Sequence, residues 1–361
     1  MKMNLDRIDK SWALSPFWKG NTVYNESVVF VPDKDGNMRA PLFYKADKVL
    51  SVRDYTLRIE YEEGLDYTIE NNMICCTKNS RMAHFTYNEF YCPDEIGENI
   101  MNYDFGGHLR VDGGWFFYPK NIHVTYTHSD EYPFAKPKFK GDLLPRTMEK
   151  LRSCQVLTAV FYGDSVISGD EVSSFLNIEP HQPIWESLFC KQLQSKYGVV
   201  IHEIDTALGG TETTWGIENA KTHIANFKPD FVILGFGSND RCSVDEYLNN
   251  IRTIVNTVRQ DSPETEFILV DPMTPHRFIA RTTDNYRWNV YQKDYALAHL
   301  ALEREIPGLA VLEIMQMHLD MQERKRFWDI NSNNINHPND FFYRIMAQVC
   351  TAMVVPPEML L

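Results

Sequence analysis

The first 135 residues carry short runs in which apolar and polar positions alternate. Four runs are rich in β-branched and aromatic residues: 27–32, 56–64, 66–76 and 123–128. Gly, Asn and Asp occur between or within these runs, as in "DKDGN" and "IENN". Alternation with period two predicts β-strands, and many short strands at close spacing are typical of an antiparallel sandwich. We therefore expect an all-β, sandwich-like accessory domain over residues 1–140.

After the Pro- and Lys-rich segment 132–146, continuous apolar runs alternate with longer amphipathic segments. Strands are expected at 157–163, 198–205, 229–237, 264–273 and 309–314, and helices at 183–198, 213–227, 243–260, 286–305 and 338–354. Ser243 is a predicted N-cap, with Glu246 in capping-box position. Buried strands alternating with helices predict an α/β/α domain with a mostly parallel sheet over residues 141–361.

Charge and composition exclude several classes of function. The net charge of −13 argues against nucleic-acid binding, which needs clustered Lys and Arg. No apolar run has the roughly 18–20 residues of a membrane helix, and the N-terminus lacks the apolar core of a secretory signal. Seven scattered cysteines without a CxxC pair fit reduced thiols. We expect a cytoplasmic protein that binds neither nucleic acid nor membrane, and self-association is left open.

Four polar stretches lie just after predicted strands or before a predicted helix. They are "GDS" (163–165), "ALGGTET" (207–213), "GSND" (237–240) and "NNINHPND" (333–340). In parallel sheets the reactive site lies beyond the carboxyl ends of the strands. A serine hydroxyl becomes a good nucleophile when a base takes its proton, and His337, just before the last helix, is the candidate base for Ser165. Asp164 is expected to shape the turn and Asp240 to cap a helix.

With these four blocks in this order, residues 150–355 resemble the SGNH hydrolase superfamily, the GDSL-type esterases and lipases. The resemblance implies that Ser165 is the nucleophile and His337 the general base. It also implies an oxyanion hole made of the backbone N–H groups of Ser165 and Gly210 and the side-chain amide of Asn239. Glycine at 210 lets the backbone approach a substrate, and a neutral amide at 239 does not repel a developing oxyanion.

The residue three positions before the histidine departs from the family pattern, because Asn334 stands where family members usually carry Asp. That Asp normally orients the imidazole and stabilises its charged form. Three alternatives remain. A Ser–His dyad can operate, with Nδ1–H bonded to a backbone carbonyl or to the Asn334 side-chain oxygen. Asp329 or another carboxylate can reach in, or the protein is an inactive relative. The dyad is favoured.

The resemblance predicts a serine esterase with a covalent acyl-Ser intermediate and no metal or cofactor. The expected substrate is a small acylated molecule, most simply an O-acetylated oligosaccharide. The alternatives are a short-chain lipid or thioester hydrolase and an inactive carbohydrate-binding relative. Trp115, Trp215 and His276 are candidate substrate-binding residues, although the aromatic rings fit core packing as well.

Overall fold

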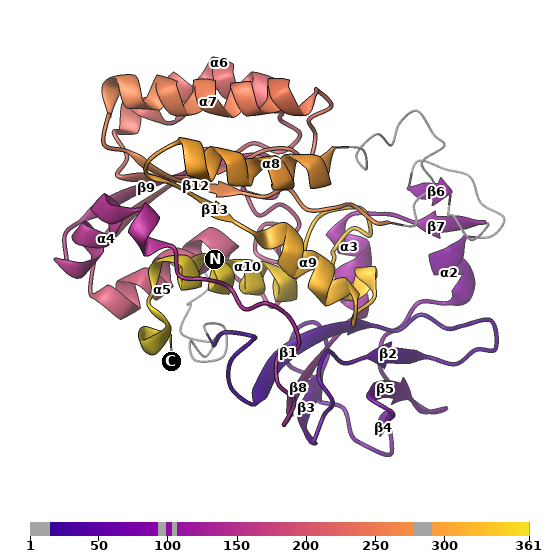
Figure 1. The fold of residues 1–361 in the computed structure, drawn as a ribbon. Helices are drawn as coiled ribbons and strands as arrows, with labels where there is room; N and C mark the ends of the chain where they lie inside the picture. The colour runs from indigo at the N-terminus through magenta and orange to yellow at the C-terminus, as the bar shows by residue number, and fades with distance from the viewer. Residues whose placement is uncertain (1–14, 93–98, 103–106, 278–290, 361) are drawn as a thin grey trace.

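The computed structural model describes residues 15–92, 99–102, 107–277 and 291–360 (Figure 1). The second half of the chain is built on a five-stranded sheet in which all neighbouring strands are parallel. The strand order is β10 (Ile201–Asp205), β9 (Leu157–Gly163), β11 (Phe231–Gly235), β12 (Glu266–Val270) and β13 (Leu309–Leu312). All five predicted strands are confirmed.

Helices cover both faces of this sheet (Figure 1). One layer contains α6 (Thr213–His223), α7 (Val244–Asp261) and α8 (Gln292–Glu305), and the other contains α4 (Pro145–Arg152), α5 (Trp185–Tyr197), α9 (Ile314–Gln322) and α10 (Asp340–Val354). Along β9, Val160 and Tyr162 belong to the buried cluster that contains residues of α6, α7 and α8. Ala159 and Phe161, on the other face, belong to the buried cluster that contains residues of α4, α5, α9 and α10. Strands buried on both faces explain the unbroken apolar runs. The predicted α/β class is confirmed.

The helix ends follow from local chemistry. Gly198 ends α5 with a left-handed φ of 67°, and the Ser243 side chain accepts a hydrogen bond from the Glu246 N–H at the start of α7. The helix predicted at 213–227 ends at His223, and a short 3₁₀ helix follows at Ala225–Phe227. The first residues of the helix predicted at 286–305 lie outside the described residues. Among the described helices, none is long and apolar enough to cross a bilayer.

The first half of the chain forms small antiparallel sheets, as expected. Their strand orders are β1 (Thr22–Val29), β8 (Asn121–Thr127), β3 (Lys48–Arg53); then β2 (Arg39–Pro41), β5 (Met73–Cys76), β4 (Tyr67–Glu70); and the pair β6 (Ile100–Asn102), β7 (His108–Arg110). Two short helices, α2 (Tyr87–Tyr91) and α3 (Gly114–Phe117), also occur here. The predicted boundary at residue 140 stays a prediction, and residues from both sides of it share one buried cluster.

Two of the predicted strands differ from the structure. The run 66–76 is a β4–β5 hairpin, because Asn71 and Asn72 both have positive φ (49° and 65°), which a two-residue hairpin turn requires. The run 56–64 contains only isolated bridges, at Glu60 and Glu63. Most of this segment is exposed and only Tyr61 is buried, so the alternating pattern indicated neither burial nor a sheet partner there.

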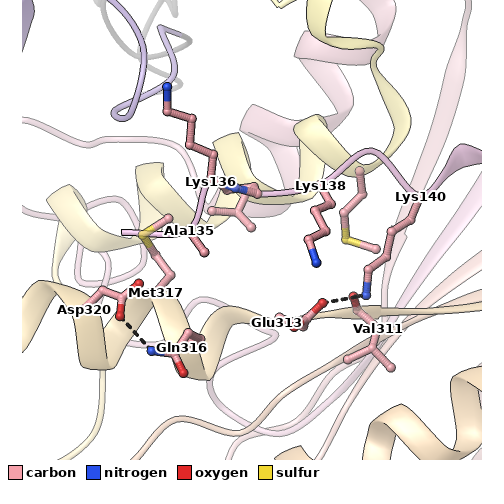
Figure 2. A pocket seen from close by; sticks show the side chains of 12 residues that line it. Ala135, Lys136, Lys138, Lys140, Val311, Glu313, Gln316, Met317 and Asp320 are labelled. Carbon is pink, nitrogen blue, oxygen red and sulfur yellow. Dashed lines mark hydrogen bonds and ion pairs between the residues drawn. The ribbon is translucent and has the colours of Figure 1, made fainter. Parts of the chain in front are cut away.

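The linking segment 132–146 packs along the edge of the parallel sheet. Lys140 Nζ lies 2.8 Å from carboxylate oxygens of both Glu303 and Glu313, and it donates to the Val311 carbonyl at 2.9 Å. A pocket of about 100 Å³ lies between the linker, α9 and α10 (Figure 2). None of the predicted catalytic residues lines it.

A buried ion pair ties the antiparallel region to the segment after α9. Lys325 Nζ lies 2.6 Å from Glu26 Oε1 and donates to the Pro41 carbonyl at 2.7 Å, and both charged side chains are fully buried. Glu26 also accepts hydrogen bonds from the Phe43 N–H (2.9 Å) and the Tyr126 hydroxyl (2.6 Å). Each buried charge is thus compensated by its ion-pair partner and by hydrogen bonds with neighbouring groups.

Breaking this pair should destabilise the protein strongly. Lys325→Met leaves the Glu26 carboxylate buried without its cation, and a loss of about 3–5 kcal/mol in the free energy of unfolding is expected. The double variant Glu26→Gln/Lys325→Met should lose less than the sum of the single losses, because no uncompensated charge remains. Urea denaturation of each variant measures this.

The exposed pair Arg53–Glu60 provides the control, since both side chains reach solvent. Arg53→Met should change the free energy of unfolding by about 1 kcal/mol or less. Equal effects of Lys325→Met and Arg53→Met would contradict the role assigned to the buried pair.

Candidate active site

The carboxyl ends of β9 and β11 bring the first and third polar stretches together. Gly163 and Gly235 face each other in the parallel register, and the Asp164 N–H donates to the Gly235 carbonyl at 3.0 Å. A Cβ on Gly163 would collide with that carbonyl oxygen, so the close approach requires glycine. The serine after this turn therefore stands at the sheet edge.

Asp164 shapes the turn, as predicted from its position. Its carboxylate accepts the Val166 N–H at 3.0 Å and the Ser238 N–H at 3.2 Å, so it joins the first polar stretch to the third. Burial raises the pKa of Asp164 to about 7, in spite of these two N–H donors.

Ser165 and His337 meet at this edge although 172 positions separate them in the sequence. His337 Nε2 lies 2.8 Å from Ser165 Oγ, within hydrogen-bond distance. Ser165 is buried, and His337 keeps only a small part of its surface exposed while its Nδ1 atom is buried. Burial of the imidazole lowers the pKa of His337 to about 4, which favours the neutral ring that can accept a proton.

Asn333 organises the loop that carries the histidine. Its side-chain oxygen accepts the backbone N–H groups of Ile335 (2.9 Å), Asn336 (3.0 Å) and His337 (3.1 Å). Ser332 closes the loop, donating from its backbone N–H to the His337 carbonyl at 2.9 Å. Sequence reasoning missed Asn333. An Asn that starts a short loop is a frequent backbone acceptor, and this could have indicated it.

The other imidazole nitrogen of His337, Nδ1, is buried and has no hydrogen-bond partner among the described residues. Asn334 adopts a left-handed φ of 59° and donates from Nδ2 to the Arg110 carbonyl at 2.9 Å, while its Oδ1 has no partner there either. Asp329 is engaged elsewhere, with the Arg326 guanidinium (2.8 Å) and the Val29 N–H (2.9 Å). Neither candidate orienting residue bonds Nδ1.

The groups expected to bind an oxyanion lie around the same edge. Gly210 has a positive φ of 79° and is exposed, and Asn239 donates from Nδ2 to the Thr211 carbonyl at 3.1 Å. No described residue accepts a hydrogen bond from the backbone N–H of Ser165 or Gly210. Two main-chain donors are therefore available to a ligand.

Asp240 caps a helix, but not the helix that follows it in sequence. Its carboxylate accepts the Thr213 N–H at 2.9 Å and the Thr213 hydroxyl, at the first turn of α6. Ser243 is the N-cap of the following helix, α7. Asp240 thus holds the start of α6 against the loop that carries Asn239.

A buried hydrogen-bond network is centred on Asp340, at the end of the histidine loop. The Asp340 carboxylate accepts the Tyr118 hydroxyl (2.7 Å), the Ser173 N–H (2.9 Å) and the Ser173 hydroxyl (2.6 Å). Gln182 Nε2 donates to the Asp340 carbonyl at 2.7 Å. Three segments distant in sequence converge here, and sequence reasoning identified none of these contacts.

Segment 110–114 of the antiparallel region contacts two loops of the site. Besides the Arg110 carbonyl described above, the Asp112 N–H donates to the Asn333 carbonyl at 3.3 Å. The Gly114 N–H donates to the Glu171 carboxylate, in the segment after Ser165. The first half of the chain therefore forms part of the wall around Ser165 and His337.

The three candidate substrate-binding residues have different surroundings. Trp115, on α3 next to this wall, is 61% exposed. Trp215 stacks on Tyr162 with ring centroids 5.4 Å apart and packs against the core. The His276 side chain is fully buried, with its ring 4.6 Å from Phe327, and it borders a pocket of about 280 Å³ that neither Ser165 nor His337 lines. Its backbone N–H donates to the Ile335 carbonyl at 2.8 Å and supports the histidine loop.

Among the described residues, no group of three or more His, Cys, Asp or Glu side chains could hold a metal ion. The site consists of a hydroxyl, an imidazole, main-chain N–H donors and amide side chains. Such a set can support acyl transfer through an activated serine.

A parallel sheet between two helix layers, with a Ser–His pair at its carboxyl edge, is the arrangement of a serine-hydrolase type of site. Residues 161–345, just over half of the chain, match the model of the GDSL-like Lipase/Acylhydrolase family. The chain belongs to this family, and the resemblance inferred from the sequence is confirmed.

Comparison with other proteins gives distant similarities. A two-domain esterase active on acetylated mannans, solved with mannopentaose, is 17% identical, with a TM-score of 0.46 over 61% of this chain and 56% of that one. An acetylxylan esterase from Geobacillus stearothermophilus is 14% identical, with a TM-score of 0.41 over 54% and 91%. The chain thus spans just over half the length of the two-domain esterase. No curated protein matches the chain.

The burial of His337 gives a testable titration. Because its pKa is lowered to about 4, the imidazole should stay neutral until the pH falls well below the usual value near 6.5. The ¹³Cε1 and ¹⁵N shifts of labelled His337, assigned by their loss in His337→Gln, should follow a midpoint near pH 4. A midpoint near pH 6.5 would contradict this description of the site.

Proposed function

We propose that this chain is a serine esterase that forms a covalent acyl-Ser165 intermediate and removes O-acetyl groups from oligosaccharides. The observation that carries the proposal is the 2.8 Å contact between Ser165 Oγ and His337 Nε2 at the carboxyl edge of the sheet. Membership of the GDSL-like Lipase/Acylhydrolase family supports the same reaction class.

In the first half of the reaction, His337 Nε2 accepts the Ser165 hydroxyl proton while Oγ attacks the ester carbonyl. The resulting oxyanion accepts hydrogen bonds from the N–H groups of Ser165 and Gly210. The Asn239 amide, which donates to the Thr211 carbonyl in the free protein, supplies a third donor after a small reorientation. One donor of this kind contributes about 3–4 kcal/mol to lowering the barrier.

In the second half, the imidazolium of His337 gives its proton to the leaving alcohol, and the acyl group stays on Ser165. Water then enters, His337 Nε2 takes a proton from it, and the hydroxide oxygen attacks the acyl carbonyl. Collapse of this intermediate releases the acid and returns the proton to Ser165 Oγ. His337 Nε2 accepts or donates the proton in every transfer, so the imidazole must keep its orientation throughout the reaction.

Asn334 is the proposed neutral orienting group for that imidazole. Its Oδ1 and His337 Nδ1 are both buried without partners, three residues apart in one loop. Because Nε2 accepts the Ser165 proton, the neutral ring already carries its hydrogen on Nδ1, and a side-chain rotation of Asn334 can supply a carbonyl oxygen to this N–H before and after the imidazolium forms. A neutral acceptor orients the ring but stabilises its positive charge less than a carboxylate does.

The proposed substrate class rests on the surroundings of the pair. Trp115 is exposed on α3, and the wall segment 110–114 that precedes it contacts both the histidine loop and the loop after the nucleophile. An exposed indole that follows a segment in contact with both loops can stack on the apolar face of a sugar ring. The same position suits an oligosaccharide better than a free acyl chain, which would need an extended apolar channel.

The esterase proposal predicts that replacing Ser165 removes most of the ester-hydrolysing activity. Ser165→Ala should hydrolyse p-nitrophenyl acetate at least about 10³-fold more slowly than the unaltered protein, because the nucleophile is removed. Ser195→Ala, an exposed serine on α5, is the matched control and should keep the full rate. Stopped assays with both variants measure this.

Equal rates for Ser165→Ala and the unaltered protein would contradict the esterase and favour an inactive carbohydrate-binding relative. The substrate class is tested by comparing acetate release from acetylated mannan or xylan oligosaccharides with hydrolysis of longer acyl esters and acyl thioesters. Higher kcat/KM on the longer acyl esters or the thioesters would favour the lipid or thioester hydrolase instead.

The orienting role predicts different results for the two candidate residues. Asn334→Ala should lower kcat about tenfold with little change in KM, the effect of one neutral hydrogen bond lost in the transition state. Asp329→Asn should leave kcat largely unchanged and lower the melting temperature, because Asp329 holds Arg326 and β1. A selective loss of kcat in Asp329→Asn, with Asn334→Ala unaffected, would reverse the assignment.

A further inference from the structure

Asp170 is a partly buried carboxylate beside the nucleophile that the proposed mechanism does not use. The turn after Ser165 fixes it, because the Asp170 N–H donates to the Ser165 carbonyl at 2.9 Å. The Tyr343 hydroxyl donates to the Asp170 carbonyl at 3.0 Å, and the Ser168 hydroxyl donates to Oδ1 at 2.6 Å. The side chain is therefore held in one orientation before any substrate binds.

The second carboxylate oxygen of Asp170 faces the oxyanion side of the site. No described residue donates a hydrogen bond to Oδ2. A Cβ added to Gly209 would lie 2.6 Å from Asp170 Oδ2 and 3.6 Å from Ser165 Cβ. The free oxygen and the nucleophile thus border the same space above the exposed Gly209–Gly210 turn.

A carboxylate at this place is unsuited to assist the chemical step directly. Negative charge beside the turn that binds the oxyanion opposes the charge that develops there. Oδ2 can, however, accept a hydrogen bond, and a bound ligand that displaces solvent from it must supply the donor. A hydroxyl on the carbon next to the ester is such a donor, and it sits close to the ester carbonyl in any partly acylated polyol.

We propose that Asp170 is a specificity-determining residue that accepts a hydrogen bond from a free hydroxyl adjacent to the ester that Ser165 attacks. The inference rests on the proposed esterase function and narrows its substrate class to partly acetylated sugars. Esters that lack a neighbouring hydroxyl leave a desolvated carboxylate oxygen without a donor and are disfavoured.

The test varies both the residue and the substrate. The substrates are a monoacetylated methyl glycoside with a free neighbouring hydroxyl and its analogue in which hydrogen replaces that hydroxyl. The unaltered protein should prefer the hydroxyl-bearing ester about 10- to 100-fold in kcat/KM, the usual effect of a hydrogen bond to a charged group. In Asp170→Ala the preference should fall to near one, and Asp170→Asn should give an intermediate value.

Asp261→Asn, an exposed carboxylate at the end of α7, is the matched control and should keep the full preference. Melting temperatures establish that each variant is folded. An unaltered protein without preference, or a preference that survives in Asp170→Ala, would overturn the proposal.

A binding measurement separates this inference from the esterase proposal. In a Ser165→Ala background, which removes the nucleophile, calorimetry gives the dissociation constants of both glycosides with and without Asp170→Ala. A loss of affinity for the hydroxyl-bearing glycoside alone supports the role of Asp170 even if no hydrolysis occurs. Equal loss for both glycosides, or none, overturns it whether or not the protein is an esterase.

Discussion

The buried carboxylate of Asp340 is the constraint on which the reactive pair depends. Asp340 begins α10 three residues after His337. Its carboxylate accepts hydrogen bonds from Tyr118 in the antiparallel region and from Ser173 in the segment after Ser165. A buried carboxylate is tolerated only when such donors surround it. Hydrogen bonds from both segments therefore fix the position of Asp340. Because the histidine loop leads directly into Asp340, they also fix that loop relative to Ser165.

The sequence predicted the parts of the site that local chemistry determines. Apolar runs ending in Gly-Asp-Ser and Gly-Ser-Asn-Asp predicted strand ends, and parallel strands place such ends on one edge. Contacts across the chain were not predictable in this way. Asn333 rather than Asn334 organises the histidine loop, and Asp329, close to His337 in sequence, bonds Arg326 and β1. Distance along the chain does not indicate which way a buried carboxylate points.

The antiparallel region contacts the loops of the site through main-chain groups as much as through side chains. The Arg110 carbonyl and the Asp112 N–H bond the histidine loop, and the Gly114 N–H bonds Glu171, the residue after Asp170. Main-chain partners leave no residue-type pattern, so the sequence indicated a separate accessory unit. The buried Lys325–Glu26 pair adds a second link between the halves. The geometry of the site is thus a property of the whole chain.

In the proposed mechanism, the absence of a carboxylate at position 334 affects differently the proton transfer from Ser165 to His337 and the transfer from His337 to the leaving alcohol. A buried imidazole with a low pKa is a weak base toward Ser165 but, once protonated, a strong acid toward the leaving group. A p-nitrophenolate leaves without protonation, whereas a sugar alkoxide is a poor leaving group and needs the proton. The imidazolium is also attracted to the adjacent oxyanion in a site of low dielectric, which replaces part of the missing carboxylate. The proposed mechanism therefore predicts a preference for esters of ordinary alcohols, for which expulsion of the alcohol is the difficult step.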